Sequence, residues 1–476
     1  MEVVAHMSTR KHRRRRLSAP ADMPVPGQGG EPGRGDMEAA AMAGERPIGR
    51  DAGSSAPHGR QKAASRGKAA IDGQAAMLLA VLTLFNSANA FSGTFVPVYL
   101  FKAGHNYSLV GMYSLLQYLC GGICVWLAGA WVKQKGLVLS LRTGVALSGI
   151  FYLSVLLLGG AARSYAAPLG MLNGIAGGFF WLAYNVLYFE ITERDNRDRF
   201  NGWAGLLGSG VGMFAPWLSG IIIAARGGDA GYAVIFGLSL ALFVLAAVIS
   251  AKLKKRPPQG RYQWFMAIRE LRDPSSPWRR FVPAILFQGL RDGVFMFLIG
   301  LTVYAATQRE KQLGSFYLVT SLVALVSFWI CGKLLRPSRR SAAMLAGTLA
   351  MTAVIVPLLA GVKYSTLLLL GIGTSLFAPL YMIPMTSAVF DLIGRSEDSA
   401  RRRVEYTVLR EASLTVGRVA GVGAFLVVAS GGTPSPDRLA WLLLILGSAP
   451  IAGWWFIRRS LKVQGQTATA AGERRP

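Results

Sequence analysis

The 476-residue sequence is poor in the side chains from which most enzyme sites are built. It contains 3 cysteines and 4 histidines, and no histidine lies inside an apolar run. The cysteines do lie in such runs, but they are too few for a tetrahedral zinc site, and we interpret them as small buried residues. No phosphate-binding loop of the form Gly-x-x-x-x-Gly-Lys-Ser/Thr occurs, which argues against ATP hydrolysis. We therefore expect no enzymatic activity, no metal site and no cofactor.

Charged residues are also scarce, at 16% of the chain, compared with about 25% in soluble domains. Hydrophobic residues make up 52% and come in long uninterrupted blocks. The formal net charge is +27, yet the Lys and Arg residues lie in the N-terminal tail and in short loops between the apolar blocks. This distribution is typical of a polytopic membrane protein, so the lipid bilayer is the expected partner and nucleic acid is not.

Twelve apolar runs from residue 75 onward are each long enough to cross a bilayer, which takes about 20 helical residues. The predicted spans are approximately 75–101, 107–131, 138–159, 165–189, 202–225, 231–251, 281–306, 313–335, 341–361, 364–393, 403–430 and 437–457. Loops rich in Lys and Arg alternate with loops that have few. The positive-inside rule then places both termini in the cytoplasm of a multi-pass protein of the plasma membrane.

The longest basic loop divides the spans into two six-helix bundles, residues 75–252 and 281–459. Within the linker, residues 253–280, aromatic and aliphatic side chains alternate with arginines, which predicts a short amphipathic helix in the membrane interface. Residues 1–73 are rich in Gly, Ala, Pro and Arg and cannot bury enough apolar surface to fold. We expect this basic tail, and the C-terminal tail 460–476, to be disordered.

The two halves share sequence features at equivalent places. The third span begins Arg142-Thr-Gly and the ninth begins Arg340-Ser-Ala, while the fourth ends Tyr-Phe-Glu190-Ile and the tenth ends Val-Phe-Asp391-Leu. Two six-span units repeated in the same orientation are the plan of one transporter architecture.

Together these features resemble the major facilitator superfamily over residues 75–459. The family's signature between the second and third spans is a Gly, an Asp four residues later, basic residues and another Gly. Here it reads Gly129-Ala-Trp-Val-Lys133-Gln-Lys-Gly136, with Lys133 in place of the Asp. The related loop of the second half, Gly332-Lys-Leu-Leu-Arg336, is basic at the same position. The resemblance implies an all-α membrane protein of twelve transmembrane helices in two parallel repeats, working as a secondary active transporter.

The eleventh span contains charges that a bilayer tolerates only beside a partner or a water-filled cavity. Glu411, Thr415 and Arg418 share one helix face by their spacing. The seventh span carries adjacent Arg and Asp residues, and the family fold implies that both helices border the central cavity. We predict a charged central site for proton coupling, with a fixed structural ion pair as the alternative. Its members are Arg291, Asp292, Glu405, Arg410, Glu411 and Arg418.

Amide and aromatic side chains on the first, fourth and tenth spans are candidates for a substrate cavity, because they stack on and hydrogen-bond an organic ligand. These residues are Asn86, Asn89, Trp181, Tyr184, Asn185 and Tyr381. The alternative is that they are ordinary packing and interface residues.

A cytoplasmic gate is expected by analogy with the family, in which an acid at the end of the fourth or tenth span pairs with bases that open neighbouring spans. The candidates are Glu190 with Arg142 and Arg199, and Asp391 with Arg340 and Arg402 or Arg403. Ordinary interfacial charges, worth about 0–1 kcal/mol each, are the alternative.

The fifth span is similar to the family's exporter signature over Gly208–Gly220, where small residues and Pro216 permit close packing and a bend. We therefore predict a monomeric, proton-coupled exporter, an antiporter of a small organic or drug-like molecule. Uptake of a nutrient such as a sugar is the alternative. Outside the class of transporters, the alternative is a non-transporting membrane sensor or scaffold.

Overall fold

The structure is a computed structural model that describes residues 72–102, 105–191, 194–255, 260–335, 337–394 and 402–473. Side chains within 194–199, at 201 and beyond 463 are not among the described ones. All of these segments belong to one compact unit, Ser65–Pro476. The N-terminal tail expected at 1–73 lies, up to residue 71, outside the described residues.

Within the described ranges the chain is helical, without strands, and twelve of its helical segments are long and apolar enough to cross a membrane. This confirms the predicted number of spans. The first half contains α1 (Gly73–Ser92), α2 (Phe95–Lys102), α3 (Tyr107–Lys135), α4 (Leu137–Leu158), α5 (Ala166–Ile191), α6 (Arg194–Arg226) and α7 (Gly228–Ala251). The second half contains α9 (Trp278–Thr307), α10 (Glu310–Leu334), α11 (Arg340–Ala353), α12 (Tyr364–Ile393), α14 (Arg403–Ala429) and α15 (Pro436–Glu473). The 3-10 turns η1 (Gly159–Arg163) and η3 (Val356–Ala360) extend α4 and α11, and η2 (Pro337–Arg339) precedes α11.

Three helices differ in their extent from the predicted spans. The first span is interrupted between α1 and α2, because Pro97 has no N–H to donate to the carbonyl of Gly93. Helix α6 begins at Arg194, before the predicted start at 202. Helix α15 continues to Glu473, so the C-terminal segment expected to be a disordered tail from residue 460 is helical to that point.

The two halves have the same internal packing, which confirms the repeat. In the first half α1 packs on α6 and α7, α3 on α5, and α4 on α5 and α7. In the second half α9 packs on α14 and α15, α10 on α12, and α11 on α12 and α15. Each helix of one half therefore has a counterpart with equivalent neighbours in the other.

The halves meet along two reciprocal seams, α3 with α14 and α6 with α10. Both seams are close because glycine lies at the contact. A Cβ added to Gly122 of α3 would lie within 2.8 Å of three side-chain atoms of Thr415. One added to Gly220 of α6 would lie 2.6 Å from the carbonyl oxygen of Glu310. Such small residues let helix backbones approach closely in membrane proteins.

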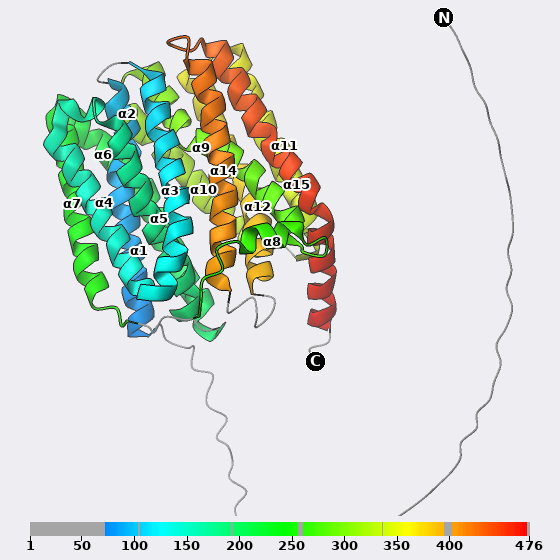
Figure 1. Cartoon of the computed structure of the whole chain (residues 1–476). Coiled ribbons are helices and arrows are strands. Elements are labelled where there is room, and N and C mark those ends of the chain that lie inside the picture. Colours follow the sequence, from blue (N-terminus) through cyan, green and yellow to red (C-terminus); the bar gives the residue numbers. More distant parts are fainter. Residues whose placement is uncertain are drawn as a thin grey trace, which may run out of the picture. The chain divides into compact units, whose positions relative to one another are not determined.

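The short linker helix α8 (Met266–Arg272) lies near the end of the bundle at which α14 begins, and α2 lies at the opposite end (Figure 1). Beside its buried Met266, the linker exposes Trp264, Phe265, Ile268 and Leu271. An amphipathic helix in the membrane interface requires such exposed apolar side chains, and its location there stays a prediction. We refer to the two ends of the bundle as the α8 end and the α2 end.

Candidate functional site

The buried charges of α9 lie side by side. Nη1 of Arg291 is 3.7 Å from Oδ1 of Asp292, with side chains 12% and 21% exposed. The Arg291 guanidinium also lies over the ring of Phe295, 4.3 Å from its centroid. Gln288, one turn earlier, donates a hydrogen bond of 3.4 Å to the other oxygen of Asp292. Arg291 and Asp292, two members of the predicted central site, therefore contact each other within α9, at a distance longer than that of a hydrogen-bonded ion pair.

Arg291 and Asp292 form the polar end of a cavity of about 260 Å³ in the second half. Helices α9, α10 and α12 build its walls, and the remaining lining is mostly apolar and aromatic. The other lining residues are Phe295, Met296, Ile299, Phe316, Tyr317, Thr320, Leu370, Gly371, Thr374 and Ser375. The arrangement suits a small organic ligand with one polar group, because such pockets combine apolar walls with few polar contacts.

Arg418 brings a second positive charge to the centre from α14. Its guanidinium lies 5.6 Å from the ring centroid of Tyr118 on α3, so the charge is at a seam between the halves. Its backbone packs directly on α9, since a Cβ at Gly293 would lie 2.5 Å from the Arg418 carbonyl oxygen. Because Gly293 follows Asp292 directly in α9, the backbone of Arg418 lies close to the part of α9 that carries the Arg291 and Asp292 charges.

Arg410 and Glu411 pair with each other, with Nη1 2.5 Å from Oε1. The Arg410 guanidinium lies 5.8 Å from the ring centroid of Phe390. Among the described contacts, none joins Glu411 to Arg418 or to Asp292. The shared helix face is therefore present in the backbone, but it does not assemble Glu411 and Arg418 into a pair.

Glu405 lies in the first turn of α14, about 20 Å along the helix from Arg418 at 1.5 Å per residue. It accepts a 2.5 Å contact from Nζ of Lys133 on α3, and the two side chains are only 1% and 8% exposed. We call this contact the α8-end ion pair. It links the halves at the position where the family signature has an aspartate, with the signs of the charges exchanged. Glu405 thus belongs to a contact between the halves at the α8 end and lies away from the central charges.

The linker covers this ion pair. The backbone N–H of Gln263 donates 3.3 Å to Oε1 of Glu405. Tyr262, next to it in the linker, packs on Gly129 of α3. Burial, followed by the nearby Glu405 carboxylate, raises the pKa of Tyr262, so its hydroxyl stays neutral. The linker therefore contacts both halves beside the α8-end ion pair.

A second contact between the halves at the α8 end is aromatic. The rings of Phe189 and Phe390 meet edge to face, with centroids 5.4 Å apart and an interplanar angle of 89°. These residues occupy equivalent positions at the ends of α5 and α12, so the repeat brings a residue into contact with its own counterpart. The Arg403 guanidinium lies 5.6 Å from the Phe189 ring centroid.

Of the predicted gate contacts, the structure shows Arg340 with Asp391, Nη1 to Oδ2 at 3.0 Å, within the second half. Its counterpart Arg142 instead donates to the carbonyl oxygens of Ser250, Ala251 and Leu253, at 3.0, 2.8 and 3.1 Å, near the C-terminus of α7. Arg402 is the N-cap residue of α14, and Glu190 is half-buried near the end of α5. The side chain of Arg199 lies outside the described residues.

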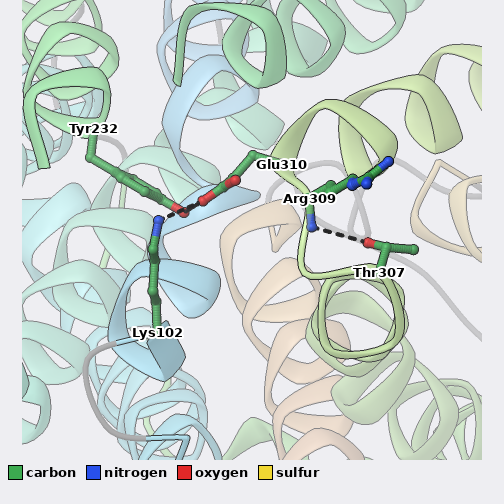
Figure 2. Close-up of polar contacts among 5 residues, drawn as sticks. All are labelled: Lys102, Tyr232, Thr307, Arg309 and Glu310. Carbon is green, nitrogen blue, oxygen red and sulfur yellow. Dashed lines mark hydrogen bonds and ion pairs between the residues drawn. The ribbon is translucent and has the colours of Figure 1, made fainter. Parts of the chain in front are cut away.

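The halves are also linked by an ion pair at the α2 end. Nζ of Lys102 lies 2.9 Å from Oε1 of Glu310, and the hydroxyl of Tyr232 donates 3.3 Å to the same oxygen (Figure 2). Lys102 and Tyr232 belong to the first half and Glu310 begins α10 of the second. The side chain of the neighbouring Arg309 extends away from this carboxylate (Figure 2). We call the Lys102–Glu310 contact the α2-end ion pair; sequence analysis missed it.

The predicted cavity residues separate into two groups. Trp181 and Tyr184 of α5 form an aromatic cluster with Phe85 and Phe180. Asn89 donates to the carbonyl of Phe85 and accepts from Tyr152, at 2.9 and 3.5 Å. Asn86 and Asn185 are half-buried.

Tyr381 forms the second group, because it lies within electrostatic reach of both Arg291 and Asp292. In the ranges that the structure covers, no three His, Cys, Asp or Glu residues gather where they could hold a metal ion.

Twelve apolar helices in two matched halves, with charges buried between and within them, define the fold of a multi-pass membrane transporter. The sequence matches the model of the Major Facilitator Superfamily over residues 76–400. The chain belongs to this family.

Two proteins and one solved structure are similar to this chain. The "Uncharacterized protein YqgE" of Bacillus subtilis (strain 168) is 40% identical over 351 residues, which is 74% of this chain and 81% of that protein. The "Uncharacterized protein in sodM 3'region" of Geobacillus stearothermophilus is 37% identical over 190 residues, 40% of this chain and 88% of that protein. A crystal structure of a bacterial homologue of the iron transporter ferroportin, in an outward-facing state with soaked iron, has a TM-score of 0.56 and 16% identity, covering 82% of this chain and 99% of that one. This last likeness concerns the fold alone.

Proposed function

We propose that the protein is a secondary active transporter in which the two halves expose a central site alternately at the α8 end and at the α2 end. The observation that carries this proposal is that an ion pair links the halves at each end, Lys133 with Glu405 and Lys102 with Glu310. Opening either end requires separation of its ion pair. Alternate breaking of the two contacts is the simplest use of a bundle that is linked at both ends.

Protons are the proposed coupling ion, and Asp292 is the group that binds them. Protonation of Asp292 removes the negative charge that faces Arg291, and so frees the guanidinium for a ligand in the adjoining cavity. A monomer suffices for this scheme, because both halves are present in one chain.

Export of a small organic molecule from the cytoplasm is the proposed direction, with the α8 end facing the cytoplasm. The basic loops at that end and the small residues of Gly208–Gly220 support it. Uptake of a nutrient is the alternative. A non-transporting scaffold is disfavoured. Lys133 replaces the aspartate of the family signature, but its pairing with Glu405 keeps an ion pair between the halves.

The test is transport by purified full-length protein in liposomes under an imposed proton gradient, with lipophilic cations, sugars and organic acids as probes. Proton movement is followed with a pH-sensitive dye inside the vesicles. We expect that adding at least one of the probes causes proton movement through the native protein, and that Asp292→Asn abolishes this movement. Asp437→Asn, at an exposed acid that begins α15, serves as the matched control and should behave as native. Equal proton movement in native protein and Asp292→Asn contradicts coupling through Asp292, and absence of all flux favours the scaffold.

A further inference from the structure

Hydrogen-bond donors exceed acceptors at the centre of the molecule. Four buried side-chain atoms there have no hydrogen-bond partner among the described residues: Arg291 Nε, Arg418 Nε, Thr374 Oγ1 and Tyr381 Oη. The two guanidinium nitrogens only donate, and the two hydroxyls are able to donate. Buried polar groups in proteins almost always form hydrogen bonds. Several donors without a hydrogen-bond partner in one region therefore indicate a ligand that supplies acceptors.

The charges of the same region do not balance either. Arg291 faces Asp292, but no ion pair to Arg418 occurs in the part of the chain that the structure describes, where its guanidinium lies over the Tyr118 ring. Glu411 is engaged by Arg410, and Glu405 by Lys133 at the α8 end. The centre therefore holds two positive charges and one negative charge, which favours an anion.

The cavity beside Arg291 provides the shape of the ligand. Phe295, Phe316 and Tyr317 line it with aromatic surface, and Thr374 contributes the buried hydroxyl. Its volume of about 260 Å³ suits a small molecule. These rings offer aromatic surface to an apolar body, and Arg291 in the same lining offers a positive charge to an anionic group.

We propose that the central site binds a small organic monoanion, a carboxylate or its equivalent on an apolar body. This inference rests on the proposed transport function and names its substrate class. Arg291 binds the anionic group, and Thr374 offers a hydrogen bond from the cavity wall. Arg418 and Tyr381 are not among the lining residues; Arg418 supplies the second positive charge from the seam, and Tyr381 brings a hydroxyl donor beside Arg291 and Asp292. Asp292 competes with the ligand for Arg291.

Three probes of similar shape and different charge test the proposal: benzoate, benzamide and benzylammonium. Equilibrium binding to purified full-length protein in nanodiscs is measured for each. We expect benzoate to bind at least about 10-fold more tightly than benzamide, because a charged acceptor forms the stronger hydrogen bond. Preference for benzylammonium, equal binding of the three, or saturable binding of none would overturn the proposal.

Variants locate the binding. Arg291→Gln should weaken benzoate binding about 10- to 100-fold, as expected for loss of one charge-assisted hydrogen bond. Asp292→Asn should strengthen it, because the competing carboxylate is removed. Arg291→Lys should recover part of the loss, and Arg438→Gln, at an exposed arginine near the α2 end, should change nothing. Unchanged benzoate binding in Arg291→Gln, with elution and circular dichroism as in native protein, contradicts the proposal.

The outcomes for binding and for transport are separable. Benzoate binding that depends on Arg291 without any transport counts against the proposed function and leaves the anion site standing. Proton-coupled movement of a cation or a sugar, with no benzoate binding, counts against the anion site and leaves the transporter standing.

Discussion

Lys133 carries a positive charge at the position where the family signature has an aspartate, and its partner Glu405 lies in the first turn of α14. An acidic group is favourable there, since the helix N-terminus carries a partial positive charge. The exchanged signs therefore preserve an attraction between the halves. Burial of both side chains makes the contact sensitive to loss of either partner, because a lone charge has no solvent to compensate it.

Lys133→Ala should lower the free energy of unfolding by about 3–5 kcal/mol, the usual cost of leaving one charge of a buried pair uncompensated. Thermal unfolding of the purified protein measures the change. Arg340→Ala is the matched control: its partner Asp391 is 54% exposed, so about 0–1 kcal/mol is expected. A similarly small decrease in the free energy of unfolding in both variants would show that Lys133 alone does not stabilise the buried Glu405 carboxylate.

At the scale of the helix, the close seams depend on small residues. Gly122 of α3 faces Thr415 of α14, and a methyl group there would overlap with the threonine side chain. Gly423, further along α14, has open space around its Cα. Close packing therefore requires a glycine at position 122 and not at position 423, although both lie in apolar helices.

Gly122→Ala should destabilise the protein by about 1–3 kcal/mol, the cost of overpacking a close contact. Gly423→Ala should be neutral or stabilising by up to about 1 kcal/mol, because alanine favours the helix and meets no neighbour. Thermal unfolding of both variants under the same conditions makes the comparison. Equal destabilisation by the two substitutions would rule out close packing at Gly122 as the cause.

Helix existence and number could be predicted from the sequence because each span is encoded by its own apolar length. The partners of the charges could not. Glu405 is 272 residues from Lys133 and Glu310 is 208 residues from Lys102, so only the packing of the halves brings them together. The predicted Arg340–Asp391 contact could be found from the repeat, whereas the contact of Arg291 with Asp292 follows from their adjacency in the sequence. The interruption at Pro97 had a local signal, namely a proline inside an apolar run.

Across the whole molecule the two ion pairs are unequal. At the α8 end the side chains of Lys133 and Glu405 are 8% and 1% exposed, whereas those of Lys102 and Glu310 at the α2 end are 39% and 12% exposed. Exposed pairs contribute little, about 0–1 kcal/mol, while a buried pair is costly to disrupt. The α2 end is therefore held less strongly, and we expect it to open more readily.

If the halves move as two bodies around one centre, loosening one end favours the conformer in which the other end stays closed. Lys133→Ala should then increase hydrogen–deuterium exchange at the α8 end, in peptides from 130–135 and 403–410, and not at the α2 end. Glu310→Gln should do the reverse, with faster exchange in 95–102 and 310–318. In the double variant the two substitutions favour opposite conformers. Exchange at each end should therefore lie between the values of the two single variants. Faster exchange at both ends in each single variant would indicate general loosening of the bundle, and would contradict reciprocal opening of its two ends.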